Sequence, residues 1–500
     1  MLTPERIKSL IESDYNSEKK TYARIARRYY KGDHDIKGYR IFFIDHEGKI
    51  HEDVTRSNIK IGHPFFKILV KQGAQYTLSG KGAFVKSDDP ELQKMLDIYF
   101  NENRRYRLEL KELLIGREVD GCAYHFAYKN AQGRTEFQYA EMGGVVEVRK
   151  NETDDGCEYV IYWYVDRIGK DNKKIKRIQV WDEKQTAFFV QEGDGAIIQD
   201  KDEKINPRPH STYTKDGDDD TYGEAYGRIP FIRIDNDRER TSSLKAVKAL
   251  IDDYDLMNCG LSNNIQDTNE SLYVVKGFDG DNLDELAFNI RNKKMLGLPG
   301  GSDIDAGVEI KTIDIPVEAR KQKMEIDETN IFRFGMGVNP NELKDSAATV
   351  SVAVKTSYAY LDLRTDDTVD YLKDFISKEL EIVLAEINKE QGTDYQQSDI
   401  YFDFTHEIIT NDLENAQIDL TKAQKRQTEI TTLLNIESRL GDEEFMKLVC
   451  EQMELDYEEI KDKLPKPQEN DPYSAGAALG ALASIPMEDE GADGGGDVIE

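Results

Sequence analysis

A polar loop between two long helical patterns leaves the fewest choices for how this chain can fold. The loop, FRFGMGVNPNELKDSAATVS, runs from Phe332 to Ser351. The helical pattern after it runs from about Thr349 to Gln391, which corresponds to about 63 Å at a rise of about 1.5 Å per residue. Gly392 follows at the position favoured for a left-handed helix cap. The fold must therefore contain one very long helix that begins directly after a flexible interruption.

The residues of this loop suit a connection that contacts something moving past it. Gly335 and Gly337 permit backbone angles that other residues avoid, so they can act as a hinge. Pro340 disfavours a helical conformation for the residue before it, which stops the preceding helix from continuing. Asp345 or Ser346 can cap the long helix. Three side chains of the loop can hydrogen-bond to phosphate or water: Asn339, Asn341 and Lys344. The alternative is an ordinary surface turn between two helices.

The composition predicts much surface per residue. The chain has 500 residues, enough for about two to four domains. Hydrophobic residues make up 38% and charged residues 33%, which favours an elongated shape or a subunit that buries modest patches against copies of itself. The formal net charge of −30 disfavours tight wrapping of nucleic acid, because such a chain repels phosphates on average. It still permits DNA to slide past a surface that does not grip it.

Signatures of secreted, membrane and metal proteins are missing from the sequence. The four cysteines are scattered without a CxxC pair, which predicts reduced, intracellular thiols. The seven histidines form no HExxH or HxxxH pattern. No apolar run approaches the roughly 20 residues needed to cross a bilayer, and the charged N-terminal segment is unlike a signal peptide. We therefore expect a soluble protein without a membrane partner.

Hydrophobic periodicity predicts an α+β chain with helices on both sides of a β region. From 122 to 236 the apolar residues recur every second position, which indicates short antiparallel strands. Residues 270–315 are predicted to form a small α/β unit between helices, with strands at 271–277, 295–300 and 308–315 and a short helix at 282–293. Residues 398–410 read as a strand. The predicted helices are 3–30, a segment starting near Pro64, two patterns within 90–121, 242–268, 316–334, the long helix, and a charged region at 411–464.

Two acidic stretches are candidate cation sites. In DGDDD (216–220) the calcium-loop pattern requires glycine where Thr221 stands and glutamate where Gly227 stands, so a solvated acidic loop is the better interpretation. In FDGDNLDE (278–285) Leu283 breaks the alternation of acids. We therefore expect neither a bound metal nor a cofactor.

Two stretches interleave arginine with tyrosine, as nucleic-acid surfaces do. They are ARIARRYYKG (23–32) and NRRYR (103–107). On helices the tyrosines would fit the core and the arginines the wet face, where salt bridges to neighbouring subunits are the favoured role. GLPGGSD (297–303) lacks the Lys-Ser/Thr ending of a phosphate-binding loop, and no nucleophile elbow is present. No residue is therefore assigned a catalytic role, and we expect that the chain is not an enzyme.

Four segments, in order, resemble the portal proteins of tailed bacteriophages, the branch found in long-tailed phages of Gram-positive hosts. They are YYKGDHDI after the first helix, NIKIGHPFFKILVKQGAQYTLSGKG at 58–82, the stretch beginning GRIPFIRIDNDRERTSSLKAVK at 227–267, and IFRFGMGVNPNELKDSAATVSVAVKTSYAYLDLRT at 331–365. The resemblance covers roughly residues 20–465. Family members often carry a glycine in the serine-rich entry to the long helix, whereas AATVSVAV in this chain has none.

The resemblance implies a portal fold with a helical stem and a long spine helix. Residues 1–241 with 393–410 would form a mixed α/β wing. The other parts would be a stem helix (242–269), a small α/β clip (270–315), a second stem helix (316–336), a tunnel loop (337–349), the spine helix (350–392) and a helical crown (411–465). The acidic, glycine-rich composition of residues 466–500 predicts a disordered tail.

The resemblance also implies a function and a set of partners. Portal proteins form a ring, usually a dodecamer, at one capsid vertex of the virion, assembled in the host cytoplasm, with a channel for packaging and ejecting double-stranded DNA. Expected partners are copies of the chain, that DNA, the terminase large subunit, a head–tail adaptor, and the major capsid and scaffolding proteins. Asp281 and Glu285 in the clip are the predicted docking residues. The alternatives are a metal-dependent nucleic-acid-processing enzyme, and a capsid scaffold or adaptor without a DNA channel.

Overall fold

The computed structural model describes residues 2–45, 47–54, 56–130, 132–149, 156–168, 173–214, 221–267, 272–276, 307–311, 316–341 and 350–405, with a few single positions between 420 and 447. The chain divides into two compact units, Met1–Ile408 and Ile409–Glu500. Every helix and strand given below belongs to the first unit. The predicted crown and the acidic tail lie almost entirely outside the described residues.

The N-terminal segment forms two helices, so the prediction of one helix over 3–30 is wrong. Helix α1 (Pro4–Tyr15) starts after Thr3, whose side chain accepts a hydrogen bond from the backbone N–H of Arg6 as an N-cap. Helix α2 (Glu18–Tyr30) starts after Ser17, whose hydroxyl accepts from the N–H of Lys20. Ser17 has an extended backbone, and this second N-cap interrupts an otherwise continuous hydrophobic pattern.

Helices form the main core of the unit. They are α3 (Phe65–Thr77), α4 (Pro90–Leu96) with a π-helical continuation (Asp97–Asn101), α5 (Arg104–Asp120) and α10 (Val350–Gln391). The long helix has the predicted position, and Gly392 caps it with a φ of +68°. Its second half packs into the core with α3 and α5, mainly through Phe375 and Leu380. The position of α10 is therefore fixed by apolar burial.

The predicted β region is antiparallel throughout its described part. A three-stranded sheet has the order β14 (Phe231–Asp235), β4 (Cys122–Lys129), β5 (Thr135–Ala140). The larger sheet has the order β10 (Ile198–Gln199), β9 (Gln185–Glu192), β8 (Lys173–Trp181), β7 (Cys157–Ile168), β6 (Val145–Arg149), with β11 (Arg208–Pro209) also on β9. A separate hairpin joins β12 (Ser211–Thr214) to β13 (Thr221–Glu224). Helix α1 covers the larger sheet through Ile7 and Ile11.

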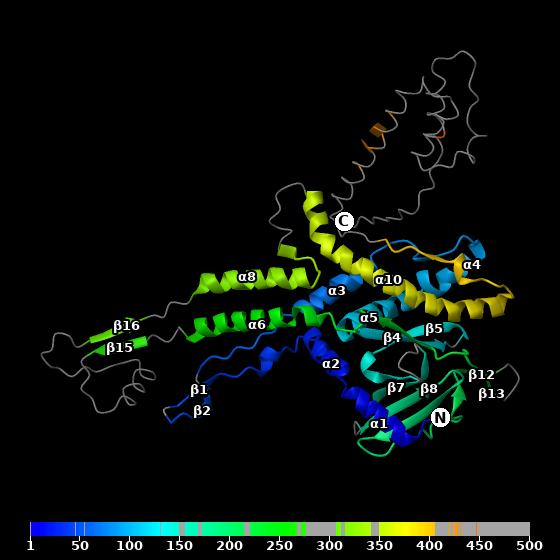
Figure 1. The fold of residues 1–500 in the computed structure, drawn as a ribbon, viewed down its shortest axis with the longest axis horizontal. Coiled ribbons are helices and arrows are strands. Elements are labelled where there is room, and N and C mark those ends of the chain that lie inside the picture. The colour runs from blue at the N-terminus through cyan, green and yellow to red at the C-terminus, as the bar shows by residue number, and fades with distance from the viewer. Residues whose placement is uncertain are drawn as a thin grey trace, which may run out of the picture. The chain divides into compact units, whose positions relative to one another are not determined.

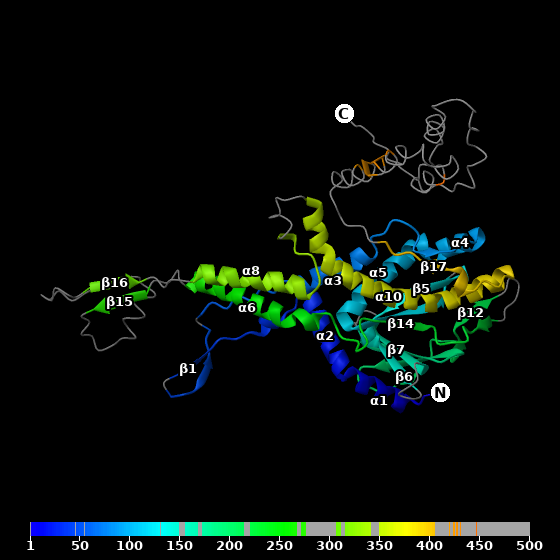
Figure 2. The ribbon, with the colours of Figure 1, turned by 45° about the horizontal axis from the view of Figure 1, so that its top comes forward.

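Helices α6 (Leu244–Asp267) and α8 (Val317–Phe334) lie side by side, as Figures 1 and 2 show. Both predicted helices are confirmed. Between them in the chain, β15 (Leu272–Lys276) pairs antiparallel with β16 (Gly307–Lys311), which confirms the outer two of the three predicted strands. The predicted strand at 295–300 and the short helix at 282–293 lie outside the described residues.

Two other short β elements differ from the predictions. The expected strand over 398–410 is reduced to β17 (Tyr401–Phe402), which pairs with β3 (Val85–Lys86). A hairpin of β1 (Phe42–Ile44) and β2 (Ile50–Glu52) was not predicted at all. Among the described helices, none has the length and hydropathy to cross a membrane.

Candidate functional site

The described start of the predicted hinge and tunnel loop, Gly335 to Asn341, packs closely on helix α3. Gly335 has a φ of −79°, a backbone conformation that any residue adopts. Space requires glycine there, because a Cβ atom would lie 2.5 Å from Leu69 Cδ1. A Cβ atom on Gly337 would lie 2.4 Å from Leu69 Cδ2. The left-handed backbone angle of this turn falls instead on Met336, whose φ is 51°. The hinge role of the two glycines stays a prediction, and their contact with Leu69 is a second reason for their presence.

Gln72 of α3 binds the backbone of the loop in two directions. Its Nε2 donates to the carbonyl oxygen of Val338 at 2.9 Å, and its Oε1 accepts from the N–H of Val338 at 3.2 Å. Val338 is itself buried beside Tyr76 and Leu361. This arrangement satisfies both polar backbone groups of a buried loop residue, so the start of the loop is firmly attached to α3.

The asparagines of the loop have intramolecular partners. Asn339 is only 5% exposed, and its Oδ1 accepts from the N–H of Asn341 at 3.0 Å. The Nδ2 of Asn341 donates to Glu328 Oε1 of α8 at 2.8 Å. A phosphate contact by Asn339 would therefore require that this turn open. Pro340 is exposed beside it, whereas Lys344 and Asp345 lie outside the described residues, as do Asp281 and Glu285 of the clip.

Arg364 of α10 joins this turn to three helices. Its Nη1 donates to the carbonyl oxygen of Leu69 at 3.2 Å and to that of Gly335 at 3.1 Å. Its Nη2 pairs with Glu118 of α5. Burial raises the pKa of the Glu118 carboxyl, and the charges of Arg364 and Arg117 oppose that rise. Movement of the loop start relative to α10 would therefore break hydrogen bonds to a guanidinium whose side chain is only 11% exposed.

Sequence reasoning missed Arg364, although a signal for it was present. Within the apolar stripe of α10, the residues at helical spacing on either side are Leu361 and Thr368, and both are buried. A charged residue on the buried face of a helix requires a partner, because an unpaired buried charge is costly. The partner, Glu118, is distant in the sequence, so the stripe alone could indicate the need but not the contact.

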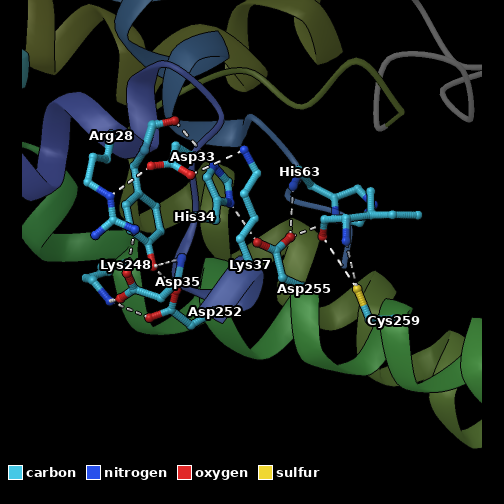
Figure 3. Close-up of polar contacts among 12 residues, drawn as sticks. Arg28, Asp33, His34, Asp35, Lys37, His63, Lys248, Asp252, Asp255 and Cys259 are labelled. Carbon is cyan, nitrogen blue, oxygen red and sulfur yellow. Dashed lines mark hydrogen bonds and ion pairs between the residues drawn. The ribbon is translucent and has the colours of Figure 1, made fainter. Parts of the chain in front are cut away.

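A second polar cluster holds α6 to the segments around α2 and α3 (Figure 3). Asp255 lies between two histidines: its Oδ2 is 2.6 Å from Nδ1 of His34, and its Oδ1 is 2.7 Å from Nδ1 of His63. Asp255 and His34 are fully buried. Burial raises the pKa of the Asp255 carboxyl, but the hydrogen bonds from both histidines outweigh burial and hold the pKa below its ordinary value.

About two turns earlier on α6, Lys248 continues this cluster. Its Nζ lies 2.7 Å from both Asp35 Oδ2 and Asp252 Oδ2. The hydroxyl of Tyr29 donates to Asp252, and burial together with this carboxylate raises the pKa of Tyr29. The YYKGDHDI segment thus contacts α6 through Tyr29, His34 and Asp35.

The arginine-tyrosine stretches find partners within the same chain. Arg27 Nε lies 2.9 Å from Glu141 Oε1, and Arg105 Nη1 lies 3.2 Å from Glu136 Oε2. Salt bridges from these stretches to neighbouring subunits stay a prediction, since Arg105 keeps 56% of its side chain exposed beside Glu136. Two tyrosines of these stretches lie in the core as expected: Tyr29 and Tyr106.

The described residues form no metal-binding cluster of three or more histidine, cysteine, aspartate or glutamate side chains. The acidic stretches 216–220 and 278–285 lie outside the described part of the chain. The three described cysteines, Cys122, Cys157 and Cys259, are free thiols. The geometry therefore points to mechanical connections between helices, centred on Arg364 and on Asp255.

Comparison with known proteins decides the family. The sequence model described as "Phage portal protein, SPP1 Gp6-like" matches residues 9–463. The chain belongs to this family. The portal protein of Bacillus phage SPP1 is 25% identical over 342 residues, which are 68% of this chain and 65% of that protein. The portal protein of Clostridium phage phiCD119 is 24% identical over 426 residues, 83% of this chain and 88% of that protein.

These portal relatives confirm the predicted family and its Gram-positive-host branch, since both phages are named for Gram-positive hosts. The portal family is structural rather than enzymatic. Among solved structures, a chain from the neck of an empty gene transfer agent particle has a TM-score of 0.39 at 14% identity, covering 77% of this chain and 90% of that one. A chain from the neck of a native particle has a TM-score of 0.36 at 14% identity, covering 77% and 89%.

Proposed function

We propose that this protein forms a ring at one vertex of a phage capsid and conducts double-stranded DNA during packaging and ejection. The family match over residues 9–463 carries the proposal. In this role the ring docks the terminase large subunit during packaging and a head–tail adaptor afterwards, and it contacts the major capsid and scaffolding proteins. ATP hydrolysis belongs to the terminase, and the portal has no catalytic activity of its own.

The described elements are consistent with the subdivision that a portal requires. The paired helices α6 and α8 would be the stem, the segment from 270 to 315 that includes β15 and β16 would be the clip, and α10 would be the spine helix. We assign residues 1–241, with 393–410, to the wing. Asp281 and Glu285 remain the proposed docking residues of the clip.

The charge of the chain supports a sliding role for the channel. Each subunit carries a formal net charge of −30, so a ring of subunits would present a strongly negative field to DNA. Phosphate contacts release counterions and strengthen binding when a surface is basic. An acidic channel wall with isolated lysines would bind the phosphates only weakly, so the DNA would stay hydrated and able to move.

We further propose that the loop after α8 has a fixed start and a DNA-facing tip. Its start, residues 335–341, is attached to α3 and α10 through Gln72 and Arg364. Lys344 is the residue we assign to DNA, since a single lysine gives only a weak electrostatic contact in each subunit. Gly337 and Asn339 would then transmit strain from the tip to α10 rather than bind DNA directly.

Light scattering and negative-stain microscopy of the purified protein test the ring. We expect a particle of several hundred kilodaltons with a central hole. A stable 57.2 kDa monomer at every salt concentration would contradict the proposal. A nucleic-acid-processing enzyme would instead show a chelator-sensitive activity.

Packaging assays test the loop and the clip separately. Lys344→Glu and Gly337→Pro should assemble into rings and proheads but package less DNA, whereas wild-type yields from both would return the loop to an ordinary surface turn. Asp281→Ala with Glu285→Ala should leave rings intact and weaken terminase or adaptor binding. Normal binding by that double variant would place the docking surface elsewhere.

A further inference from the structure

The hairpin β1–β2 exposes apolar side chains that the rest of the described unit does not cover. Side chains alternate between the two faces of a strand, so Phe42 and Ile44 share one face, and Ile50 is the direct cross-strand partner of Ile44. These three side chains are 58%, 70% and 70% exposed. A two-stranded hairpin is only marginally stable by itself in water, and the exposure of these three apolar side chains to water is unfavourable. The hairpin therefore requires a cover.

The hairpin is attached to α6 by a regular set of hydrogen bonds. The extended segment 57–63, which follows the hairpin in the chain, runs antiparallel to α6, and every second backbone N–H donates to a side chain of that helix. The bonds are Ser57 N–H to Asp267 Oδ1 at 3.1 Å, Ile59 to Asn263 Oδ1 at 2.7 Å, Ile61 to Cys259 Sγ at 3.2 Å, and His63 to Asp255 Oδ1 at 2.9 Å. Figure 3 shows the end of this ladder at Asp255 and Cys259.

The hydrogen bonds form a regular series because the spacing of the donors along the extended segment nearly equals the spacing of the acceptors along α6. The four acceptors are spaced four residues apart on α6, a rise of about 6 Å per step. Two residues of extended chain span about 6.6 Å, so successive donors keep pace with successive acceptors. Each step also removes an unpaired N–H from the extended segment. The segment is thus held in one register along α6, and the hairpin that it carries is presented from a fixed base.

The charges of the hairpin are compensated within the hairpin itself. Three ion pairs join its ends, turn and arm: Arg40 Nη1–Glu52 Oε2 at 3.2 Å, Lys49 Nζ–Glu47 Oε2 at 2.8 Å, and Arg56 Nε–Asp53 Oδ2 at 3.3 Å. The remaining carboxylate, Asp45, has Nε2 of His51 at 2.7 Å from its Oδ2, so the charge of the hairpin nearly cancels. The whole chain, in contrast, carries a net charge of −30. Two copies of such a chain repel each other over most of their surfaces, and contact is least opposed where the charge cancels locally.

We propose that the Phe42, Ile44 and Ile50 face of the hairpin is a contact between subunits, covered by a second copy of this chain. We assign the partner as another copy of the chain because two strongly acidic chains can associate most easily through an apolar surface whose charges are compensated. A basic partner would instead bind to the acidic surfaces of the chain. The α6 ladder fixes the hairpin so that every copy offers it in the same orientation. This contact rests on the ring of the proposed function.

The double variant Ile44→Asp with Ile50→Asp tests the contact by sedimentation and light scattering. Both side chains are exposed, so the subunit should fold, whereas a pair of carboxylates would be buried in the interface. We expect assembly to require at least about tenfold more protein than for wild type. The matched control is Ile198→Asp, an isoleucine that is 51% exposed on β10, which should assemble as wild type does.

A second measurement does not depend on the double variant. A photo-crosslinking amino acid such as p-benzoylphenylalanine placed at Ile50 should crosslink neighbouring copies on irradiation, and the same amino acid placed at Ile198 should not. Rings of the double variant at wild-type concentrations, or equal crosslinking at both positions, would overturn the contact while leaving the portal ring in place. A wild-type protein that is only a monomer would overturn the ring and the contact together.

Discussion

The second half of α10 and the paired helices α6 and α8 are stabilised by different kinds of contact. In α10, apolar side chains are fully or almost fully buried along several successive turns: Leu372, Phe375, Ile376, Leu380 and Val383. On α6 after Asp255, only Cys259 is buried, and on α8 no residue before Asp327 is buried. The contacts between these parts of α6 and α8 are polar, such as the ion pair of Lys323 Nζ with Asp253 Oδ2 at 2.5 Å.

This difference separates a helix that builds the fold from helices that are free to serve an assembly. Apolar burial contributes most to the position of α10 and does not itself titrate with pH. The same half of α10 also holds a fully buried carboxylate, Glu379, whose Oε1 lies 2.7 Å from Nδ1 of His125. The α6–α8 pair depends on hydrogen bonds and ion pairs, which contribute less and respond to pH. A surface that the subunit does not bury is available to a neighbour, as a ring would require. Substitutions in the two regions should therefore differ in how much they lower the free energy of unfolding and in whether that loss depends on pH.

The largest expected effect is in α10. Phe375→Ala removes a fully buried ring from the main core and should lower the free energy of unfolding by about 3–5 kcal/mol. The same change at Phe334, which is 54% exposed at the end of α8, should cost less than about 1 kcal/mol. Urea denaturation of the two variants compares the regions directly, and equal losses would contradict the distinction.

A smaller and pH-dependent effect is expected at Asp255. Asp255→Ala should lower the free energy of unfolding by about 2–3 kcal/mol near neutral pH, because it leaves buried donors of His34 and His63 without an acceptor. The pKa of Asp255 is lower in the folded than in the unfolded state, so its contribution is complete above the unfolded pKa and is lost as pH falls through the folded pKa. Asp255→Asn should therefore show a flatter loss of stability in acid than wild type. Parallel acid profiles would show that Asp255 does not carry this linkage.

Much of the fold could be predicted from sequence because its signals are local. The bounds of α10 follow from a continuous helical pattern and from Gly392, and those of α6 and α8 follow in the same way. The break at Ser17 was missed because one capping serine competes with a hydrophobic stripe that continues across it. The hairpin at 42–52 was missed because its apolar residues are exposed, so no alternation between buried and exposed positions marks it.

The candidate site was predictable only in part. The loop composition indicated a turn and a hinge, but the partners of its residues lie elsewhere in the chain: Gln72 on α3 and Arg364 on α10. The α6 ladder has a pattern of Asp, Cys, Asn and Asp at four-residue spacing, which helical periodicity alone treats as an ordinary polar face. Such contacts become visible only when an extended segment is known to lie beside the helix.

A moderate effect is expected where the loop contacts α3. Gly337→Ala places a Cβ atom 2.4 Å from Leu69 Cδ2 and should cost about 1–2 kcal/mol of unfolding free energy. In a Leu69→Ala background the same change should cost less, because the clashing methyl group is gone. A double-mutant cycle by urea denaturation measures this coupling. Identical costs in both backgrounds would mean that the cost does not come from Leu69 but from the other close neighbour of this Cβ, Gln72 Oε1 at 2.7 Å, or from lost backbone freedom, as the hinge hypothesis holds.

The smallest expected effect is at the polar contact between the loop and α8. Asn341→Ala removes the 2.8 Å hydrogen bond to the carboxylate of Glu328, and should lower the unfolding free energy by only about 0.5 kcal/mol because both groups are accessible to water. Asn341→Asp should cost slightly more, since a second carboxylate would face Glu328, and added salt should reduce that difference. Both substitutions keep the backbone N–H that donates to Asn339, so the turn itself should persist.

If Asn341→Ala leaves stability unchanged but alters the amount of packaged DNA, this contact affects loop movement rather than the stability of the fold. A loss of unfolding free energy as large as that of Phe375→Ala would mean that this polar contact contributes as much to stability as the apolar core of α10. The distinction between the two regions would then be wrong.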